Sequence, residues 1–390
     1  MELALYCPNC GYYEKEEDII GRHGDYYTSV SVGSLFGELL AFQFAEWLQE
    51  GEGPCSEGRG GQEEEAMRVV EAGAHGGDLA RDILRWLQEH RPSLFHRMQY
   101  WIVEPSEPRQ IRQQRKLAEF GNRVRWVGEL ASLTGGTCPV ARVPPPVGLR
   151  GIVFSNELLD AMPVHRLGWD AKARVWFEWG VTCRAGCFVW TRIKEGRAGG
   201  GDQPWSAALP SSEIQLPIRS ELLEVLPDGF TTELSPLAGQ WWREAAMALE
   251  CGKLVAIDYG LTAEEFFMPE RKGGTLRGYH GHRLAFDVLA NPGQQDITAQ
   301  VNFTAIRAVG ESVGLTTDAF LTQAQFLTSL AARTWKDEGS FGNWTPERIR
   351  QFQTLTHPEH LGRSFRVLVQ ERSAPSTPWH SGQGIGGSSS

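Results

Sequence analysis

Hydrophobic residues recur along the chain with two different periods, and the way these periods alternate predicts the fold. In residues 34–48 apolar side chains return every three or four positions, as in an amphipathic helix. From residue 67 onward, short apolar runs alternate with longer amphipathic ones. The short runs predict strands at 67–73, 98–106, 122–128 and 149–157, and the longer runs predict helices at 78–90 and 107–120. This alternation predicts an α/β fold, a parallel sheet with helices on both faces.

The rest of the chain departs from this alternation. Residues 173–192 alternate over shorter runs and predict an antiparallel hairpin. Buried strands are expected at 252–260 and 364–372, and a helical stretch at 301–331. Residues 51–65 are polar and rich in glycine, which is typical of a linker or a mobile loop.

The composition is that of an ordinary globular protein, with 41% hydrophobic and 22% charged residues among 390. The chain has no run of about eighteen apolar residues, so no membrane-spanning helix is expected. The net charge of −10 argues against a general nucleic-acid binder. The first residues lack the basic-then-apolar pattern of a signal peptide, and the cytoplasm is therefore the default expectation.

Seven cysteines are spread along the chain without the pattern of a disulfide framework. Cys7 and Cys10 have the spacing of half a zinc site, but a structural zinc ion needs four ligands and no second C-x-x-C occurs. His280 and His282 suit a polar lid better than a metal site. The sequence therefore predicts no metal.

The segment between the first strand and the helix that follows it is the best candidate for a ligand site. Glu71 precedes Gly73, Gly76 and Gly77, where backbone N–H groups and the helix dipole favour an anionic ligand group. The spacing is not the G-x-G-x-x-G pattern of dinucleotide-binding loops. An acid before the glycines suits S-adenosylmethionine, which presents an amino acid to such a loop. A tight turn without a ligand explains this motif equally well.

Acidic side chains follow two more of the predicted strands. Glu104 ends the second strand, where a carboxylate can accept hydrogen bonds from ribose hydroxyls. Glu157 and Asp160 follow the fourth strand, and a helical turn limited by Pro163 would project both from one face. Such a pair can orient a cationic nucleophile. Solvated acids and a helix cap are the alternative interpretation of these residues.

Several motifs, taken together in their order and spacing, resemble the MidA-like methyltransferase family, which includes the mitochondrial complex I assembly-factor arginine methyltransferase. The resemblance covers most of residues 4–330. It is carried by GYY at 11–13, GDYYTS at 24–29, FGELLA at 36–41, VEAGAHGG at 70–77, NELLDAMPVHRL at 156–167, AIDYG at 256–260, GTLRGYHGHR at 274–283 and PGQQDITAQVNF at 292–303.

This resemblance implies the fold, the cofactor and the reaction. The expected fold is a class I methyltransferase (Rossmann-like) sheet with helices on both faces, helical additions and an inserted lid. The expected cofactor is S-adenosylmethionine, and the expected reaction is methylation of a protein arginine. The expected partner is a protein substrate, with no nucleic acid and no membrane, and a homodimer is one option.

The resemblance also assigns residues and segments. Cofactor-binding roles fall on Gly24, Asp25, Thr28, Glu71, Gly73, Gly76, Gly77 and Glu104, and an active-site turn on Asn156, Glu157 and Asp160. The expected organisation begins with a cofactor-covering segment at 1–50 and a Rossmann-like core at 66–260, which includes a hairpin at 164–192. An insertion or lid follows at 261–300. The chain then continues with C-terminal helices and the last core strand at 301–372, and a flexible tail at 373–390.

Two departures from the family pattern bear on activity. His75 stands where the family's loop has its middle glycine, and a side chain there can crowd the approach of the backbone to a ligand. Gln300 and Asn302 replace an ionisable pair of the family. These two departures leave open the alternative that the chain is a non-catalytic member of the family, which acts as a binding or assembly protein. A methyltransferase of a small molecule is a further alternative.

Overall fold

The structure is a computed structural model, and it describes residues 1–15, 28–50, 67–133, 148–193, 216, 220–281, 283–336 and 338–373. The predicted linker at 51–65, the tail from residue 374, Gly24, Asp25 and His282 lie outside the described residues.

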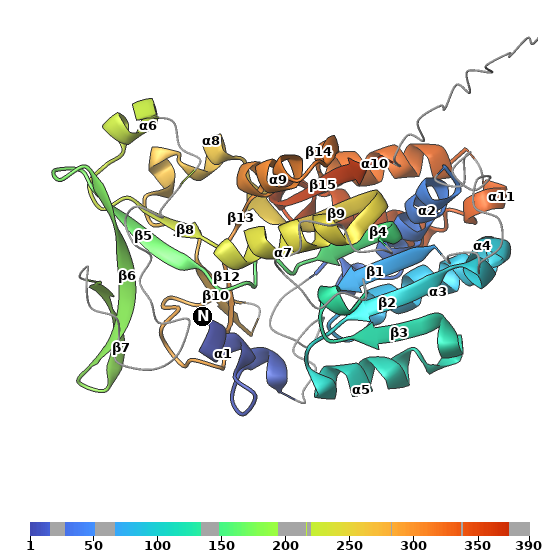
Figure 1. The fold of residues 1–390 in the computed structure, drawn as a ribbon, viewed down its shortest axis with the longest axis horizontal. Coiled ribbons are helices and arrows are strands. Elements are labelled where there is room, and N and C mark those ends of the chain that lie inside the picture. Colours follow the sequence, from blue (N-terminus) through green and yellow to red (C-terminus); the bar gives the residue numbers. More distant parts are fainter. Residues whose placement is uncertain are drawn as a thin grey trace, which may run out of the picture.

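A twisted main sheet runs through the molecule in the strand order β3-β2-β1-β4-β9-β15-β14, and a short strand, β13, pairs with β9 (Figure 1). The pairs from β3 to β9 are parallel, whereas β15 is antiparallel to both β9 and β14. The strands are β1 (Arg68–Ala72), β2 (Gln99–Val103), β3 (Val124–Val127), β4 (Leu149–Asn156), β9 (Leu249–Leu261), β13 (Val301–Asn302), β14 (Thr316–Thr322) and β15 (Phe365–Arg372). The expected α/β sheet is therefore present.

Buried strands separate two hydrophobic cores, one on each face of this sheet. Successive residues of a strand point to opposite faces, so Val69 packs into one core and Val70 into the other. The same holds for Phe154 and Val153 of β4. Because both faces are covered, the central strands read as continuous apolar runs in the sequence.

Helices cover both faces of the main sheet. They are α2 (Leu35–Glu50), α3 (Asp78–His90), α4 (Pro92–Arg97), α5 (Glu107–Lys116), α7 (Pro236–Ala248), α9 (Phe303–Ser312), α10 (Gln323–Thr334), α11 (Glu338–Phe341), α12 (Pro346–Thr356) and α13 (Leu361–Ser364). The amphipathic stripe of α3 is confirmed, since Leu79, Ile83, Trp86 and Leu87 are all buried. Within the described part of the chain, no helix combines the length and the apolar run needed to cross a bilayer.

Two smaller sheets lie at the end of the molecule away from α4 and α11 (Figure 1). One has the order β7-β6-β5-β8 and the other β11-β10-β12. Their strands are β5 (His165–Asp170), β6 (Val175–Arg184), β7 (Cys187–Arg192), β8 (Thr231–Leu234), β10 (Arg277–His280), β11 (Arg283–Leu284) and β12 (Asp296–Thr298), with the short helices α1 (Glu2–Tyr6), α6 (Ser220–Val225) and α8 (Ala263–Phe266) nearby. The hairpin expected from the sequence is thus part of a four-stranded antiparallel sheet.

The stretch at 301–331, predicted to be helical, contains a strand as well. Residues Thr316–Thr322 form β14, the edge strand of the main sheet, between α9 and α10. Its apolar residues Ala319, Phe320 and Leu321 are consecutive and only half-buried. An edge strand of this kind has no clear period of two, which is why its sequence did not distinguish it from a helix.

A buried glutamine on β15 ties the last strand to the helix layer. Gln370 has no exposed surface, and its Oε1 accepts a hydrogen bond of 2.8 Å from the indole Nε1 of Trp242 on α7. Its Nε2 donates to the carbonyl of Arg307 on α9 and to Oγ1 of Thr317 on β14, at 3.0 Å each. One side chain therefore joins four elements.

Replacing Gln370 by leucine should lower the free energy of unfolding by about 2–4 kcal/mol, because it leaves the Trp242 N–H buried without a partner. In the double variant Gln370→Leu/Trp242→Phe the loss should be smaller than the sum of the single losses, since both polar partners are gone. Urea unfolding measures all three. Gln240→Leu, on the exposed side of α7, is the control and should change stability by less than about 0.5 kcal/mol. Strictly additive losses would contradict this account of the pair.

Candidate active site

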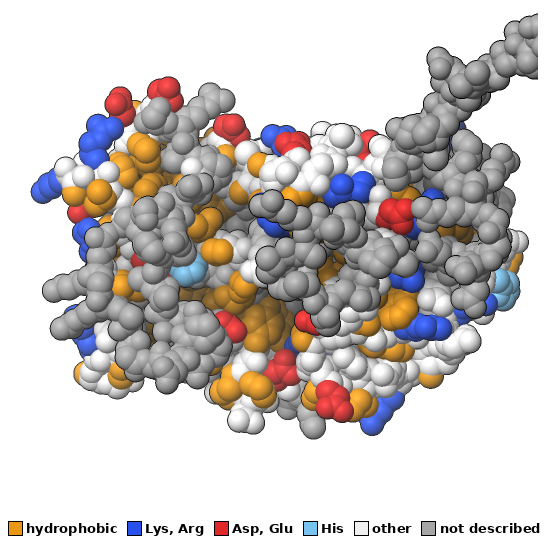
Figure 2. Space-filling view, viewed as in Figure 1, with side chains coloured by type: hydrophobic (Ala, Val, Ile, Leu, Met, Phe, Trp, Pro, Cys, Tyr) orange, Lys and Arg blue, Asp and Glu red, His pale blue; other side chains and the backbone are white. Residues whose placement is uncertain are grey.

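A cavity of about 800 Å³ opens at the carboxyl ends of β1, β2 and β4. The residues that follow these strands form its floor, while Tyr6, Tyr13 and Thr28 from the N-terminal segment form part of its wall. Carboxyl ends of parallel strands are where open α/β sheets bind ligands. Figure 2 shows one face of the molecule, and near the centre of that face, beside α1, hydrophobic side chains are flanked by acidic ones.

The loop after β1 has the backbone shape of a glycine loop although it contains a histidine. Gly73 and Gly77 have φ values of 77° and 82°, and His75 has a φ of 43°. A Cβ atom on Gly73 would lie 3.0 Å from Cδ1 of Leu158, so this position favours glycine for space as well as for conformation. The carbonyl of His75 accepts a hydrogen bond of 2.8 Å from Gln113 Nε2. The left-handed conformation at His75 is therefore held by α5.

Glu71 lies at the base of this loop and is buried. The hydroxyl of Tyr100, on the neighbouring strand β2, donates a hydrogen bond of 2.7 Å to its Oε2. Burial disfavours the charged carboxylate and raises the pKa of Glu71 to about 7, although the bond from Tyr100 opposes this rise.

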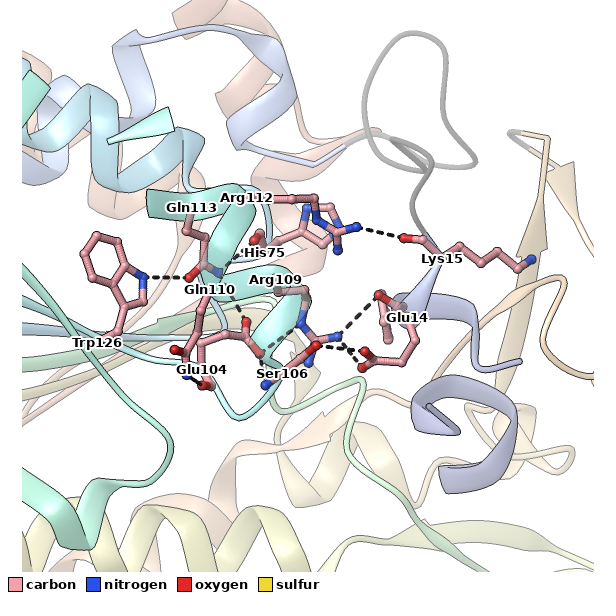
Figure 3. A network of polar contacts seen from close by, with 11 residues as sticks. Glu14, Lys15, His75, Glu104, Ser106, Arg109, Gln110, Arg112, Gln113 and Trp126 are labelled. Carbon is pink, nitrogen blue, oxygen red and sulfur yellow. Dashed lines mark hydrogen bonds and ion pairs between the residues drawn. The ribbon is translucent and has the colours of Figure 1, made fainter. Parts of the chain in front are cut away.

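Glu104, at the end of β2, is the centre of a polar network (Figure 3). Its Oε1 accepts hydrogen bonds of 2.9 Å from the backbone N–H of Ser106 and from Nε of Arg109. Its Oε2 accepts a longer bond of 3.2 Å from Gln113. A carboxylate has about four acceptor sites, so Glu104 keeps acceptor capacity on its cavity side.

Arg109 extends this network to the N-terminal segment. Its Nη1 lies 3.0 Å from Oε1 of Glu14, and Oγ of Ser106 donates to the other oxygen of Glu14 at 2.8 Å (Figure 3). Arg112 adds a bond of 3.0 Å to the carbonyl of Lys15. Residues 14 and 15 are thus anchored to α5, beside the end of β2. The sequence analysis did not single out Arg109 and Gln113, although their spacing of four places them on one helical face.

The turn after β4 is not the helical turn expected from the spacing of Glu157 and Asp160. Glu157 has a φ of 54°, in the left-handed region, and the turn that follows is irregular. Glu157 and Asn156 line the cavity, whereas Asp160 is buried behind it. The helical turn that would project both carboxyl groups from one face is therefore not formed, and only Glu157 lines the cavity.

Asp258, on β9, holds this turn in place. Its Oδ2 accepts the backbone N–H groups of Leu158 at 3.1 Å, Leu159 at 2.8 Å and Asp160 at 3.4 Å. Its Oδ1 accepts the N–H of Tyr259 at 2.8 Å. Asp258 has no role among the residues predicted from the sequence, although an acid inside the buried strand predicted at 252–260 was an available signal.

The buried carboxyl groups affect one another's protonation. Burial and the charge of Asp258 raise the pKa of Glu157 to about 8. Burial, followed by the charge of Asp258, raises the pKa of Asp160 well above its usual value, and burial raises that of Asp258 to about 7. Backbone N–H donors favour the charged form of a carboxyl group. Asp258 therefore carries the negative charge, while Asp160 keeps its proton and shares it with Asp258.

Two tyrosines of the N-terminal segment complete the wall near this turn, and each is fixed by a hydrogen bond. The hydroxyl of Tyr13 donates to Oδ1 of Asp296 at 2.6 Å, and that of Tyr6 donates to the carbonyl of Ala161 at 3.0 Å. The two tyrosine rings are 5.5 Å apart between centroids. None of these side chains is among the site residues predicted from the sequence.

The structure brings most of the predicted site residues to one cavity. The predicted residues that line it are Thr28, Glu71, Gly73, Gly76, Glu104, Asn156 and Glu157. Gly77 and Asp160 lie beside it without lining it. Gly24 and Asp25 lie outside the described residues.

Gln300 and Asn302, which depart from the family pattern, lie away from the cavity wall. Asn302 is the N-cap of α9, and its Oδ1 accepts the N–H of Ala305 at 3.2 Å. Asparagine caps a helix about as well as aspartate does. The backbone N–H of Gln300 donates to Oγ1 of Thr275 at 3.2 Å. Neither residue lines the cavity, so this change leaves the wall of the site unaltered.

Comparison with known proteins places the chain among methyltransferases. The family model for S-adenosyl-L-methionine-dependent methyltransferases matches residues 39–321. The chain is 29% identical to the mitochondrial protein arginine methyltransferase NDUFAF7 of Mus musculus and 27% identical to its Drosophila melanogaster homologue, over 95% of this chain and 79% of each relative. A Burkholderia thailandensis protein solved with S-adenosyl-homocysteine bound is 28% identical, with a TM-score of 0.74 over 96% of this chain and 87% of that one.

These relatives confirm the expected fold, cofactor and reaction class, and they correct one expectation. The cytoplasmic location expected by default is contradicted, because the relatives from Mus musculus and Drosophila melanogaster are named as mitochondrial proteins. The cofactor is S-adenosylmethionine, as expected. The chain belongs to the family of S-adenosyl-L-methionine-dependent methyltransferases.

Proposed function

We propose that this methyltransferase acts on the guanidinium group of a protein arginine, and that Glu157 binds that group. The proposal rests on the position of the Glu157 carboxyl group, which lines the cavity from a strained turn that Asp258 fixes. Strained backbone that the surroundings enforce is typical of functional sites. The names of the related arginine methyltransferases supply the acceptor class.

The residues around the cavity fit the expected cofactor. The side-chain Oδ1 of Asn156 is buried at the cavity and has no hydrogen-bond partner among the described residues, so it is available to an ammonium group. Backbone at Gly73 and Gly76 allows close approach to the amino-acid part of the ligand. The spare acceptor sites of Glu104 suit ribose hydroxyls. We assign Thr28 and Glu71 to the same cofactor-binding set.

The N-terminal segment, predicted at 1–50, belongs to this proposal as the cover of the cofactor. Tyr6, Tyr13 and Thr28 line the cavity, and Glu14 is tied to Arg109. Arg109 also binds Glu104, the proposed ribose acid. In this assignment one arginine links the cover to the cofactor-binding strand end.

The charge of the cavity favours cationic ligands. Its lining includes seven acidic residues and three arginines. The acids are Glu71, Asp78, Asp82, Glu104, Glu129, Glu157 and Glu244, and the arginines are Arg81, Arg85 and Arg109. Each arginine is paired with a carboxylate. The acidic groups therefore outnumber the arginines, and in their ionised form they attract cations, which suits both a sulfonium cofactor and a guanidinium acceptor.

Methyl transfer needs alignment more than it needs acid–base catalysis. S-adenosylmethionine, when bound, supplies an electrophilic methyl group on a sulfonium sulfur. The task of the protein is to hold the acceptor nitrogen in line, and alignment of this kind is worth about 7–11 kcal/mol. Arginine is protonated at neutral pH. Glu157, once ionised, would therefore pair with the guanidinium and direct one nitrogen, which loses a proton during or after the transfer, while Asp160 and Asp258 hold the turn.

A labelling experiment tests the proposal. The protein is incubated with methyl-labelled S-adenosylmethionine and cell lysate, the products are separated by size, and labelled protein is hydrolysed to amino acids. Labelled methylarginine in protein is the expected result. Label in small molecules alone would favour a small-molecule methyltransferase. A chain that binds neither S-adenosylmethionine nor S-adenosyl-homocysteine in calorimetry would support the non-catalytic alternative.

Replacing His75 by glycine should change the dissociation constant for S-adenosyl-homocysteine by less than about threefold. The reason is that His75 already has the left-handed backbone that a glycine would adopt there. Titration calorimetry measures the effect. An affinity gain above about tenfold would mean that the imidazole crowds the ligand.

Replacing Glu157 by glutamine should lower turnover about 100-fold or more, because the amide cannot offset the guanidinium charge and aligns it less well. The dissociation constant for S-adenosyl-homocysteine should change little. Glu311→Gln, an exposed carboxyl change on α9, is the matched control and should keep full activity. Equal losses of turnover and cofactor affinity would assign Glu157 to cofactor binding instead.

Binding of an arginine peptide acceptor should strengthen as the pH rises toward 8 and then level off. Below its pKa of about 8, Glu157 must lose a proton before it can pair with the guanidinium. The dissociation constant should therefore fall by up to about tenfold per pH unit in this range. Calorimetry in buffers of different ionisation enthalpy counts the released proton. Glu157→Gln should flatten the profile, and an unchanged profile in that variant would point to another titrating group.

A further inference from the structure

Cys7 and Cys10 lie in a tight turn directly after α1. The backbone N–H groups of Cys10 and Gly11 donate to the carbonyl of Cys7 at 3.2 and 2.7 Å. In a turn closed by such a bond, the Cα atoms of its first and fourth residues lie within about 7 Å, a separation that a disulfide bond can span. A Cβ atom on residue 11 would lie 2.5 Å from the nitrogen of Cys7, so glycine keeps the turn this tight.

The two thiols already interact. The Cys10 thiol hydrogen-bonds to the sulfur of Cys7, which also accepts a hydrogen bond from the backbone N–H of Asn9. The bond from Asn9, followed by the bond from Cys10, lowers the pKa of the Cys7 thiol. The bond to Cys7 raises the pKa of the Cys10 thiol. Cys7 is half-exposed and Cys10 is exposed, so reagents in solution reach both. The thiolate is the reactive form of cysteine, which makes Cys7 the better nucleophile of the two.

The hairpin of β6 and β7 offers a natural comparison within the same chain. Cys183 and Cys187 are both exposed and are also close in sequence. The register pairs Cys183 with Phe188 and Arg184 with Cys187, so the two cysteines point to opposite faces of the sheet. Side chains that point apart cannot form a disulfide without movement of the backbone.

A metal site explains the Cys7–Cys10 turn less well. A structural zinc ion takes four protein ligands. Among the described residues, no group of three or more His, Cys, Asp or Glu side chains is arranged to hold a metal ion. The turn thus offers two thiols and no third ligand within the part of the chain that the structure covers.

We propose that Cys7 and Cys10 form a reversible intramolecular disulfide by exchange with a low-molecular-weight disulfide. The Cys7 thiolate attacks one sulfur of the reagent, which forms a mixed disulfide and releases one thiolate. Cys10 loses its proton to solvent and attacks the sulfur of Cys7, which releases the second thiolate. Two protein thiols are oxidised, and one small disulfide is reduced to two thiols.

The location of this dithiol gives it a route to the cavity. Cys7 directly follows Tyr6, and the turn leads into Tyr13, and both tyrosines line the cavity. Tyr13 also holds Asp296. The dithiol is nevertheless independent of the reaction proposed for the cavity, because its chemistry needs neither the cofactor nor an acceptor.

The test is exchange between the reduced full chain and oxidised glutathione. Samples are quenched at intervals with iodoacetamide, digested and mapped by mass spectrometry. The peptide with Cys7 and Cys10 should become two hydrogens lighter and resist alkylation, whereas Cys183 and Cys187 should carry separate glutathione adducts or remain thiols. Dithiothreitol should reverse the change.

Single variants separate the two roles. Cys10→Ser should trap a glutathione adduct on Cys7, while in Cys7→Ser the adduct on Cys10 should form at least about tenfold more slowly. Melting temperatures of both variants check that they fold. Open thiols at both positions after prolonged incubation with excess oxidised glutathione, or equal rates in the two variants, would overturn the proposal. Zinc that copurifies with the chain and is lost in Cys7→Ser would replace it with a metal site.

Discussion

The geometry of the site depends on one carboxylate at the end of a buried strand. Asp258 accepts the N–H groups of the turn between Asn156 and Ala161, and without these bonds the donors would be buried without partners. Unpaired buried donors cost about 1–3 kcal/mol each. This stabilisation exceeds the cost of a left-handed residue, which is about 1–2 kcal/mol, so Glu157 remains in a conformation that it would not adopt alone. The carboxyl nearest the cavity is thus positioned by another strand.

The same arrangement explains why neighbouring acids differ in their protonation. Asp258 receives several backbone donors and can remain charged, whereas Asp160 lies against that charge and keeps its proton. Glu157 has few donors and one open side, so its state responds to what enters the cavity. Three carboxyl groups in one small region therefore differ: Asp258 anchors the turn, Asp160 holds a proton, and Glu157 lines the cavity, where we propose that it contacts the acceptor.

The hydrophobic pattern was sufficient to predict the central strands and α3, because residues buried on both faces of a sheet must be apolar over a continuous run. It missed β14, an exposed edge strand, and the extent of the four-stranded sheet, whose last strand comes from residues 231–234. Glu71 was found because it lies near the end of β1, before the glycines of the loop, and Glu104 and Glu157 were found because each directly follows a strand. The backbone of Glu157 and the roles of Asp258 and Arg109 depend on contacts between segments far apart in the sequence, which no local pattern records.

The link from Glu14 through Arg109 to Glu104 has a kinetic consequence. Tyr6, Tyr13 and Thr28 form part of the wall of the cavity, so a movement of the chain that carries Tyr6 and Tyr13 would open this wall. That movement separates the Arg109–Glu14 ion pair, which is largely shielded from solvent. Ion pairs shielded from solvent are screened little by salt. In the proposed assignment, in which this segment covers the cofactor, the residence time of the cofactor would therefore depend on the Arg109–Glu14 ion pair as well as on the contacts that the cofactor itself makes.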